Sequence, residues 1–400
     1  LSYAKAQDNN HGTSEAAALF IGGLFLSANK TNSQYLHWVK KGRNLLENRV
    51  FRLIDVDGNF SQNSVNYHRL MLDTLSITEY FRVVAKQNVF SASFYEKAKQ
   101  ATLWLYGLVD ETNGLAPNFG LNDGANLLPI TPCDYRDFRS SVQFASLQFF
   151  NALAYPHHVS AEQLTRLFSC QSITSSLDVT KLNHRYQTGL AKLSNQCFSA
   201  FVRTHDGKFR PSACDGLHLD LWCDNKNIFI GTGSYSYNSE CELKDYFNST
   251  EAHNTVQFDG QQQMPKLSRF LYNDWLKCQH HQDTTSLFAS YKNNQGHQHA
   301  RKVTLETDDQ ITIVDSVSGF SQKAQLRWHL ADNTWQLNSN RLTHNNIDIE
   351  VACDVGELTV SLVEGWTSYY YAEKVPSVVL VIEVHQPCAI TTTITRHLCG

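Results

Sequence analysis

The apolar residues change their spacing partway along the chain, and this change limits the fold more than any other feature of the sequence. From about Ser14 to Cys170 they come in helix-length blocks, with little of the alternation that marks strands. Ser14, Ser33 and Ser160 are the expected helix caps. We predict an all-helical half made of stacked antiparallel pairs. Its helices should cover Glu15–Ser27, Gln34–Asn48, Asn63–Lys86, Ser93–Leu108, Ser140–Tyr155 and Ala161–Cys170.

After about Gly189 the pattern is one of short β-branched and aromatic runs, separated by turn signals such as Asp206-Gly207 and Asp259-Gly260. Many short strands at regular spacing predict an antiparallel β-sandwich. We therefore expect a helical domain over 1–182 and a sandwich over 183–400. The predicted strands are Cys197–Thr204, His218–Cys223, Asn227–Ile230, Thr255–Phe258, Leu287–Tyr291, Arg301–Glu306, Gln310–Ser316, Gln325–Leu330, Ile347–Cys353, Glu357–Leu362 and Ser377–His385.

Composition narrows the class of protein. The 400 residues exceed what one hydrophobic core normally holds, and 42% apolar with 18% charged residues is typical of globular chains. No apolar run approaches about 18 residues, so no membrane span is expected. The net charge of −4 does not indicate nucleic-acid binding, and recognition of an acidic polymer would need a local basic cluster.

The ten cysteines are scattered and none forms a CxxC pair, which predicts buried free thiols rather than a disulfide framework or a cysteine zinc site. The chain begins at Leu1 and shows no signal peptide, so we expect a truncated or processed form of a longer protein. A periplasmic location is favoured over a cytoplasmic one.

The first candidate motif is Asn9-Asn10-His11-Gly12-Thr13-Ser14-Glu15, directly ahead of an apolar helix block. Residues at such a position face unbonded backbone N–H groups, which favour a carboxylate. The alternative is that the asparagine and serine side chains only cap the helix.

The second candidate motif is the turn Asp57-Gly58-Asn59-Phe60, followed by a helix start that contains Asn66-Tyr67-His68-Arg69. Tyr67 and His68 point about 100° apart on a helix, so we expect one of them to face a cleft. The alternative for Tyr67 is a core aromatic whose hydroxyl is satisfied.

Together these motifs resemble the heparinase II/III-type lyases, a group that includes heparin-sulfate lyases and oligoalginate lyases. The resemblance covers about two thirds of the chain and continues through 117–125, 134–139, 209–222, 231–238 and 249–256. It implies an (α/α) toroid-type helical domain before the antiparallel β-sandwich. It also implies a polysaccharide lyase, a carbon–oxygen lyase that cleaves a uronate-containing polysaccharide by β-elimination and requires no cofactor.

β-Elimination needs a base for the proton next to the sugar carboxylate and an acid for the departing oxygen. Hydrogen-bond donors must also offset the carboxylate charge. The resemblance implies that Asn10 neutralises the carboxylate and that Tyr67 transfers protons. His11 lies beside them as a second base or carboxylate partner.

Five residues form the expected substrate-binding set. Arg136 and Arg139 suit bidentate contacts with carboxylates or sulfates, although pairing with Asp134 and Asp137 is an equal alternative. The others in the set are Arg69, Asn122 and Tyr237.

In the sandwich, a period of two puts Leu217, Leu219 and Leu221 on one face of a strand and His218, Asp220 and Trp222 on the other. Relatives bind a structural zinc through two His and one Asp. His218 and His253 match the histidines, but Gly231 holds the aspartate position. Asp220 would replace that ligand only if the strand bends. The alternative is a pair of hydrogen-bonded histidines without metal.

A second departure is Gly216, where many relatives carry a histidine that assists catalysis. Proton transfer would then depend on Tyr67 and His11. Tyr235, Tyr237 or His253 could assist, and we include His253 in the catalytic set. This pattern resembles a subgroup linked with bacterial surface polysaccharides.

Two rival functions stay open. A glycoside hydrolase would need two carboxylates across the scissile bond, and Glu15, Asp57, Asp123 and Asp137 form no recognisable pair. A non-catalytic polysaccharide-binding or assembly protein is made plausible by the side chains missing at Gly216 and Gly231.

Overall fold

The computed structural model describes residues 2–29, 32–170, 172–178, 186, 188–238, 243–268 and 271–397. The chain divides into two compact units. The first combines residues up to Ala116 with the segment that starts at Gly124, and the second combines Pro117–Asp123 with the chain from Tyr186 onward. The predicted domain boundary at 182–183 lies outside the described residues.

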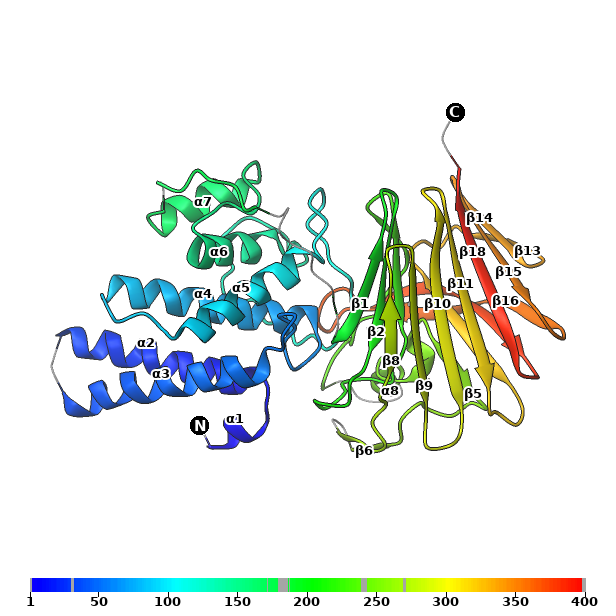
Figure 1. Cartoon of the computed structure of the whole chain (residues 1–400), viewed down its shortest axis with the longest axis horizontal. Helices are drawn as coiled ribbons and strands as arrows, with labels where there is room; N and C mark the ends of the chain where they lie inside the picture. The colour runs from blue at the N-terminus through cyan, green and yellow to red at the C-terminus, as the bar shows by residue number, and fades with distance from the viewer. Residues whose placement is uncertain are drawn as a thin grey trace. The chain divides into compact units, whose positions relative to one another are not determined.

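The first unit is helical, and each predicted helix block contains a helix (Figure 1). Helices α2 and α3 run antiparallel, and they approach closely because Gly42 has no side chain. A Cβ at Gly42 would lie 2.5 Å from the backbone nitrogen of Phe20. The helices are α1 (Ser2–Ala6), α2 (Asn10–Asn29), α3 (Ser33–Leu53), α4 (Val65–Val84), α5 (Ala92–Tyr106), α6 (Arg139–Phe150) and α7 (Val159–Leu167).

The three serines predicted as caps do not cap these helices. Ser14 lies inside α2, which begins at Asn10. The N-cap of α3 is Asn32, and the N-cap of α7 is His158, whose side chain accepts from the backbone N–H of Ser160. For Ser33 and Ser160 the prediction was wrong because a side-chain acceptor one or two residues earlier serves as well as a serine hydroxyl. For Ser14 it was wrong because the helix begins earlier than expected, at Asn10.

The second unit holds two eight-stranded sheets within its described residues, which confirms the antiparallel sandwich prediction. One sheet has the order β1-β2-β3-β4-β12-β17-β16, with β5 beside β12, and the other has the order β13-β14-β15-β18-β11-β10-β9-β8. Paired strands are antiparallel, as between β10 and β11. The hairpin β6–β7 and the short helices α8 (Leu243–Tyr246) and η1 (Thr250–Ala252) complete the unit.

The strand bounds are β1 (Gly189–Ser194), β2 (Phe198–Thr204), β3 (Leu219–Cys223), β4 (Lys226–Phe229), β5 (Val256–Phe258), β6 (Lys266–Ser268), β7 (Leu271–Tyr272), β8 (Gln279–Gln282), β9 (Ser286–Lys292), β10 (Gln298–Thr307), β11 (Gln310–Ser318), β12 (Ala324–Leu330), β13 (Gln336–Asn338), β14 (Arg341–His344), β15 (Ile347–Cys353), β16 (Leu358–Thr367), β17 (Val375–Val384) and β18 (Cys388–Arg396).

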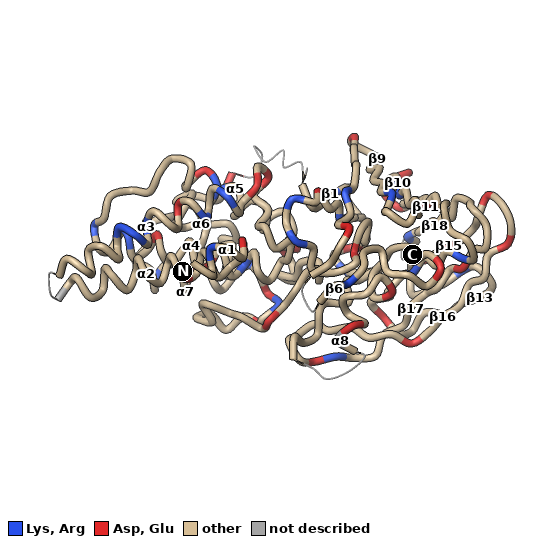
Figure 2. The backbone as a smooth tube through the Cα atoms, turned by 90° about the horizontal axis from the view of Figure 1, so that it is seen from below, with Lys and Arg blue, Asp and Glu red and all other residues tan. Residues whose placement is uncertain are grey.

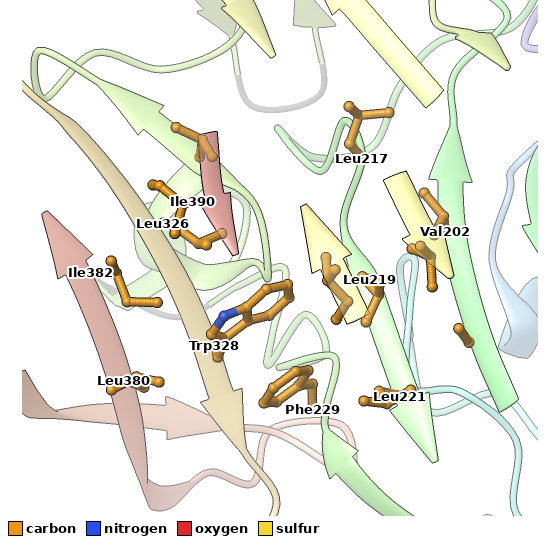
Figure 3. Close-up of a cluster of buried hydrophobic side chains, with 14 of the residues drawn as sticks. Val202, Leu217, Leu219, Leu221, Phe229, Leu326, Trp328, Leu380, Ile382 and Ile390 are labelled. Carbon is orange, nitrogen blue, oxygen red and sulfur yellow. The ribbon is translucent and has the colours of Figure 1, made fainter. Parts of the chain in front are cut away.

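The core of the sandwich lies between the two sheets and confirms the predicted facing of β3 (Figure 3). Leu219 and Leu221 of β3 belong to the buried apolar cluster between the sheets. The cluster also contains Phe229 and Trp328, whose rings stack with centroids 4.4 Å apart. On the opposite face, Asp220 accepts a hydrogen bond from the indole N–H of Trp222 at 2.6 Å. Alternation along the strand therefore separates packing from polar contacts.

Acidic and basic residues mix along the backbone of both units (Figure 2). The eight cysteines among the described residues are free thiols, as predicted, and Cys214, Cys223 and Cys388 are buried. In the part of the chain that the structure describes, no helix is long and apolar enough to cross a membrane.

Candidate active site

The start of α2 carries Asn10 and His11. Asn9 caps the helix, because its side-chain oxygen accepts from the backbone N–H of His11 at 3.1 Å and its carbonyl accepts from that of Gly12 at 3.1 Å. The backbone N–H of Asn10 donates to the side chain of Gln62 at 2.7 Å. The predicted pocket of unbonded backbone N–H groups is therefore wrong, since protein acceptors already take these donors.

The side chains of Asn10 and His11 are the groups that this helix end offers to a ligand. Asn10 is half-buried and His11 is exposed. Within the described residues, neither side chain hydrogen-bonds another protein group, while the neighbouring Asn9 does the capping. The alternative in which Asn10 acts only as a cap does not hold.

Contacts of Asp8 with three residues fix this helix end in place. The Asp8 carboxylate accepts from Arg49 at 3.0 Å and from Arg52 at 2.6 Å, and hydrogen bonding to Arg52 is the largest cause that holds the Asp8 pKa below its usual value. The hydroxyl of Ser61 donates to the carbonyl of Asp8 at 3.0 Å. The start of α2 is thus tied to α3 and to the loop that leads into α4.

The loop before α4 is a compact turn. The Asp55 carboxylate accepts from the backbone N–H groups of Asp57 and Asn59, both at 2.9 Å. Gly58 has φ +94°, and a Cβ there would overlap the carbonyl of Gln100 on α5. Ser64 then caps α4 by accepting from the backbone N–H of Tyr67 at 3.2 Å. As a result, the starts of α2 and α4 lie at the same end of the helical unit (Figure 1).

The adjacent Tyr67 and His68 have different surroundings. His68 is buried, stacks on Trp104 with centroids 4.4 Å apart, and has its Nε2 2.8 Å from the carbonyl of Ala101. Burial lowers the pKa of His68 to about 4, so this imidazole is neutral at ordinary pH. His68 belongs to the core. Tyr67 is also buried, at 7% exposure, and its role in proton transfer stays a prediction beside the alternative of a core aromatic.

Arg69 does not fit its predicted role in substrate binding. It is 2% exposed, and its guanidinium donates to the carbonyls of Tyr135 and Ala125. The same group lies over the Tyr135 ring at 4.1 Å and the Phe138 ring at 4.8 Å. Arg69 therefore holds the 125–138 segment against α4 and has a positioning role.

Arg139 pairs with Asp137, which was the alternative to substrate binding. Its guanidinium forms two hydrogen bonds with Asp137, at 3.0 and 2.7 Å, and donates to the carbonyls of Glu111 and Thr112. Arg136 is half-buried, and its backbone N–H donates to the Asp134 carboxylate at 2.8 Å. The substrate-binding role of Arg136 stays a prediction.

The loop Pro117–Asp123 belongs to the sandwich unit, which the sequence analysis missed. The Asn118 amide donates to the carbonyls of Gly231 and Ser368, at 2.9 and 3.1 Å. Asn122 is buried, and its backbone N–H donates to Ser234 at 2.8 Å. A Cβ at Gly231 would overlap the carbonyl of Asn118. The glycine-rich Gly231-Thr232-Gly233 run was the signal that another backbone approaches here.

His218 and His253 are neighbours with separate hydrogen-bond partners. Nδ1 of His218 accepts from the backbone N–H of Asn254 at 2.9 Å, and Nδ1 of His253 lies 2.7 Å from the carbonyl of Ser249. Their rings are 5.5 Å apart and nearly perpendicular. Burial lowers the pKa of both imidazoles, so both are neutral near pH 7. Nδ1 of each ring fits the alternative of hydrogen-bonded histidines, whereas Nε2 of His218 is buried without a hydrogen-bond partner among the described residues.

The residues around this pair do not fit the predicted zinc site. Gly231 leaves no room for an aspartate, and the Asp220 carboxylate is taken by the side chains of Trp222 and Asn227 and by the backbone N–H of Gly231. Among the described residues, only one group of three His, Cys, Asp or Glu side chains converges closely enough for a metal, and it lies in the helical unit.

The remaining predicted positions lie in the sandwich unit. A Cβ at Gly216 would lie 2.5 Å from a methyl group of Leu276, so a side chain there would displace this leucine. Tyr237 packs near Tyr371 with ring centroids 5.9 Å apart, and its backbone N–H lies 3.4 Å from the Tyr371 hydroxyl. The roles assigned to Tyr237 and His253 stay predictions.

A helical unit followed by a two-sheet sandwich is the layout of a class of carbohydrate-active proteins, and sequence comparison places the chain more narrowly. Residues 180–395, more than half of the chain, match the profile described as Heparinase II/III-like, C-terminal. The chain therefore belongs to this family. Among curated proteins, none matches the chain in sequence.

Solved structures share the fold over almost the whole chain. A heparinase III with methylated lysines matches with a TM-score of 0.75 at 16% identity, over 97% of this chain and 59% of that one. Heparan sulfate lyase HepC from Pedobacter heparinus matches with a TM-score of 0.71 at 14% identity, over 98% and 61%. A chondroitin AC lyase from Streptomyces coelicolor A3 matches with a TM-score of 0.51 at 9% identity, over 95% and 62%. The chain thus spans about three fifths of the length of these proteins.

Proposed function

We propose that the chain is a polysaccharide lyase that cleaves a uronate-containing polysaccharide by β-elimination, and that its helices form part of an (α/α) toroid. Family membership supports the proposal, as does the fold shared with lyases of two different polymers. The observation that carries it is the hydrogen bond from Asn10 to Gln62, which ties the start of α2 to the loop that leads directly to Tyr67.

In the proposed reaction, the Asn10 amide donates to the uronate carboxylate and offsets its charge as the adjacent carbanion develops. The Tyr67 phenolate takes the proton from the carbon next to the carboxylate. The electron pair forms the new carbon–carbon double bond while the bond to the glycosidic oxygen breaks. Tyr67 then returns the proton to the departing oxygen, so one residue serves as base and acid.

His11 is proposed to share the carboxylate with Asn10. It follows Asn10 in the first turn of α2 and is exposed. The N-terminal end of a helix also favours the negative charge of the substrate, even though its own N–H groups are already bonded.

The substrate is proposed to be an acidic bacterial surface polysaccharide with few sulfates. Sulfate recognition favours arginines with open donors. In the helical unit, the guanidinium groups of Arg69 and Arg139 are committed to protein oxygens. Neutralisation of a single carboxylate by Asn10 needs no such cation.

The test is a screen of uronate polymers, sulfated and unsulfated, for ultraviolet absorbance from the unsaturated uronide product. Cleavage by the unaltered protein that is lost in Tyr67→Phe would support the proposal. Faster cleavage of the unsulfated polymers would support the proposed substrate. Reducing ends without that absorbance would indicate a hydrolase. Polymer binding without any cleavage would indicate the non-catalytic alternative, which the missing side chains at Gly216 and Gly231 favour.

A further inference from the structure

Three residues of different chemistry converge in the helical unit, outside the candidate active site. Cys133, Asp137 and His158 each offer a ligand atom, and all three atoms lie within 4.8 Å of one another. Cys133 and Asp137 come from the loop before α6, and His158 is the N-cap residue of α7. No other group of this kind occurs among the described residues, and each of the three side chains is half-buried.

The spacing of these atoms suits a shared metal ion better than direct bonds. Nε2 of His158 lies 3.5 Å from Oδ2 of Asp137, beyond the 2.7–3.2 Å of a normal hydrogen bond. Two ligands of a tetrahedral zinc, each about 2.0–2.1 Å from the ion, lie roughly 3.4 Å apart. The separation between His158 and Asp137 is close to that edge length.

Neighbouring groups already orient two of the three ligands. Nδ1 of His158 lies 2.7 Å from the Ser160 hydroxyl, which leaves Nε2 directed at the cluster. Arg139 holds the Asp137 carboxylate with two hydrogen bonds and is itself anchored on two carbonyls. Such outer contacts are typical of histidine and carboxylate ligands in metal sites. Ligation through Nε2 needs the imidazole tautomer in which Nδ1 carries the proton and donates to the Ser160 hydroxyl.

We propose that Cys133, Asp137 and His158 bind a divalent cation of the zinc class. One thiolate, one carboxylate and one imidazole form a ligand set that zinc accepts and that magnesium and calcium do not favour. Binding removes the thiol proton of Cys133, so it is accompanied by proton release. Because the protein supplies three half-buried ligands, a water molecule would occupy the fourth coordination position.

The site would act on the candidate active site through Tyr135. This residue lies between Cys133 and Asp137 in the sequence, and its ring and carbonyl hold Arg69. Arg69 is two residues beyond Tyr67 on α4. A metal that joins 133–137 to the start of α7 would therefore steady the segment against which α4 packs, and its role would be positioning.

The test is a titration of the reduced, metal-free protein with Co²⁺, a spectroscopic substitute for zinc. We expect one equivalent to bind with a cobalt–thiolate charge-transfer band, and excess Zn²⁺ to remove the band. Cys133→Ser should abolish the band and weaken binding by about 100-fold or more. Ser160→Ala, which removes an outer contact only, should weaken it about 10–100-fold. Cys170→Ser, another half-buried thiol in this unit, is the matched control and should bind as the unaltered protein does.

A measurement on the unaltered protein separates metal binding from folding. Zn²⁺ should slow alkylation of Cys133 and leave that of Cys170 unchanged, as read by peptide mass spectrometry. His158→Asn keeps a capping side chain for α7 and should lose the protection. Absence of the cobalt–thiolate band would overturn the proposal. So would a Cys133→Ser variant that binds cobalt as tightly as the unaltered protein, or alkylation of Cys133 that Zn²⁺ does not slow. Lyase activity does not enter any of these readouts.

Discussion

The two units place their polar side chains in opposite situations. In the helical unit, Asn10 and His11 lie at a helix end, and among the described residues their side chains hydrogen-bond no other protein group. In the sandwich, His218 and His253 are buried, bonded and neutral. A histidine in this fold is therefore not a sign of catalysis by itself. The unbonded side chains of Asn10 and His11 are better candidates for substrate contact than these buried histidines.

The sandwich also commits its buried charges to its own structure. The Asp315 carboxylate accepts from Arg301 at 2.7 Å and lies 2.6 Å from Nε2 of His299. Arg301 on β10 donates to the carbonyls of Leu217 and Asn254, which lie just before β3 and β5 of the other sheet. The contrast predicts that substitutions in the helical site lower activity and leave the folding stability unchanged. Substitutions in the sandwich network should lower the folding stability first.

The largest effect is expected for Tyr67→Phe. The proposed base and acid are lost together, so kcat/KM should fall by about 10⁴-fold, the upper range for general acid–base catalysis. The melting temperature should stay within a few degrees of the unaltered protein, since only a hydroxyl is removed. Activity would be measured by product absorbance on the best polymer of the screen. A loss below tenfold would remove Tyr67 from the centre of the mechanism.

Next comes Asp315→Asn in the sandwich. The substitution leaves the Arg301 guanidinium buried without its counter-charge, which typically costs about 3–5 kcal/mol of folding free energy. Urea unfolding followed by tryptophan fluorescence measures this loss. The matched control is Asp348→Asn, whose partner Arg341 is exposed, and it should change the midpoint little. Equal effects of the two variants would contradict the structural role given to the buried pair.

Sequence periodicity was sufficient to predict most of the fold. The helix blocks and most strands follow from apolar spacing, because burial of one face is a local property of each element. The facing of Leu219 and Asp220 on β3 was predictable for the same reason. The cap residues were not, since several acceptors compete within two positions of a helix start.

The candidate site was only partly predictable, because partners far apart in sequence decide which side chain is left unbonded. Nothing local in the sequence indicates that Arg69 is covered by Tyr135, or that Gln62 accepts from Asn10. The docking of Asn118 on Gly231 is equally non-local. Motif spacing predicted the segments around Asn10 and Tyr67, but only the structure shows that Asn9, and not Asn10, caps α2.

Asn9 and Asn10 provide a matched pair that sharpens the comparison. Asn10→Ala should lower kcat/KM by about 10²–10³-fold, the usual cost of removing one donor that stabilises developing charge. It should leave unfolding unchanged. Asn9→Ala removes the helix cap instead and should cost about 1 kcal/mol of folding free energy with little change in kcat. The reverse pattern, with Asn9 controlling activity, would reassign the carboxylate-binding role to the other asparagine.

A pH dependence distinguishes the two units further. Asp73 on α4 is buried, and burial raises its pKa to about 7, against the opposing effects of Arg69 and Ser141. Because the folded state then binds a proton that the unfolded carboxyl has released, stability should fall as pH rises from about 4 to about 7. Between pH 5.5 and 6.5 the expected decrease is about 1 kcal/mol. Asp215 in the sandwich has the opposite sign. Burial alone would raise its pKa, but Arg203 and His205 hold it well below the usual value, so its contribution is present at neutral pH and lost only in acid.

Asp73→Asn tests this difference. The amide keeps the shape of the side chain but cannot ionise, so the decrease in stability between pH 5.5 and 6.5 should vanish while the acid limb of the unfolding profile remains. Urea denaturation by circular dichroism at 222 nm, which reports mainly on the helices, measures the change across that window. If stability still falls with pH in Asp73→Asn, the proton is bound by another group. The helical unit would then lack the protonated buried carboxyl that distinguishes it from the sandwich.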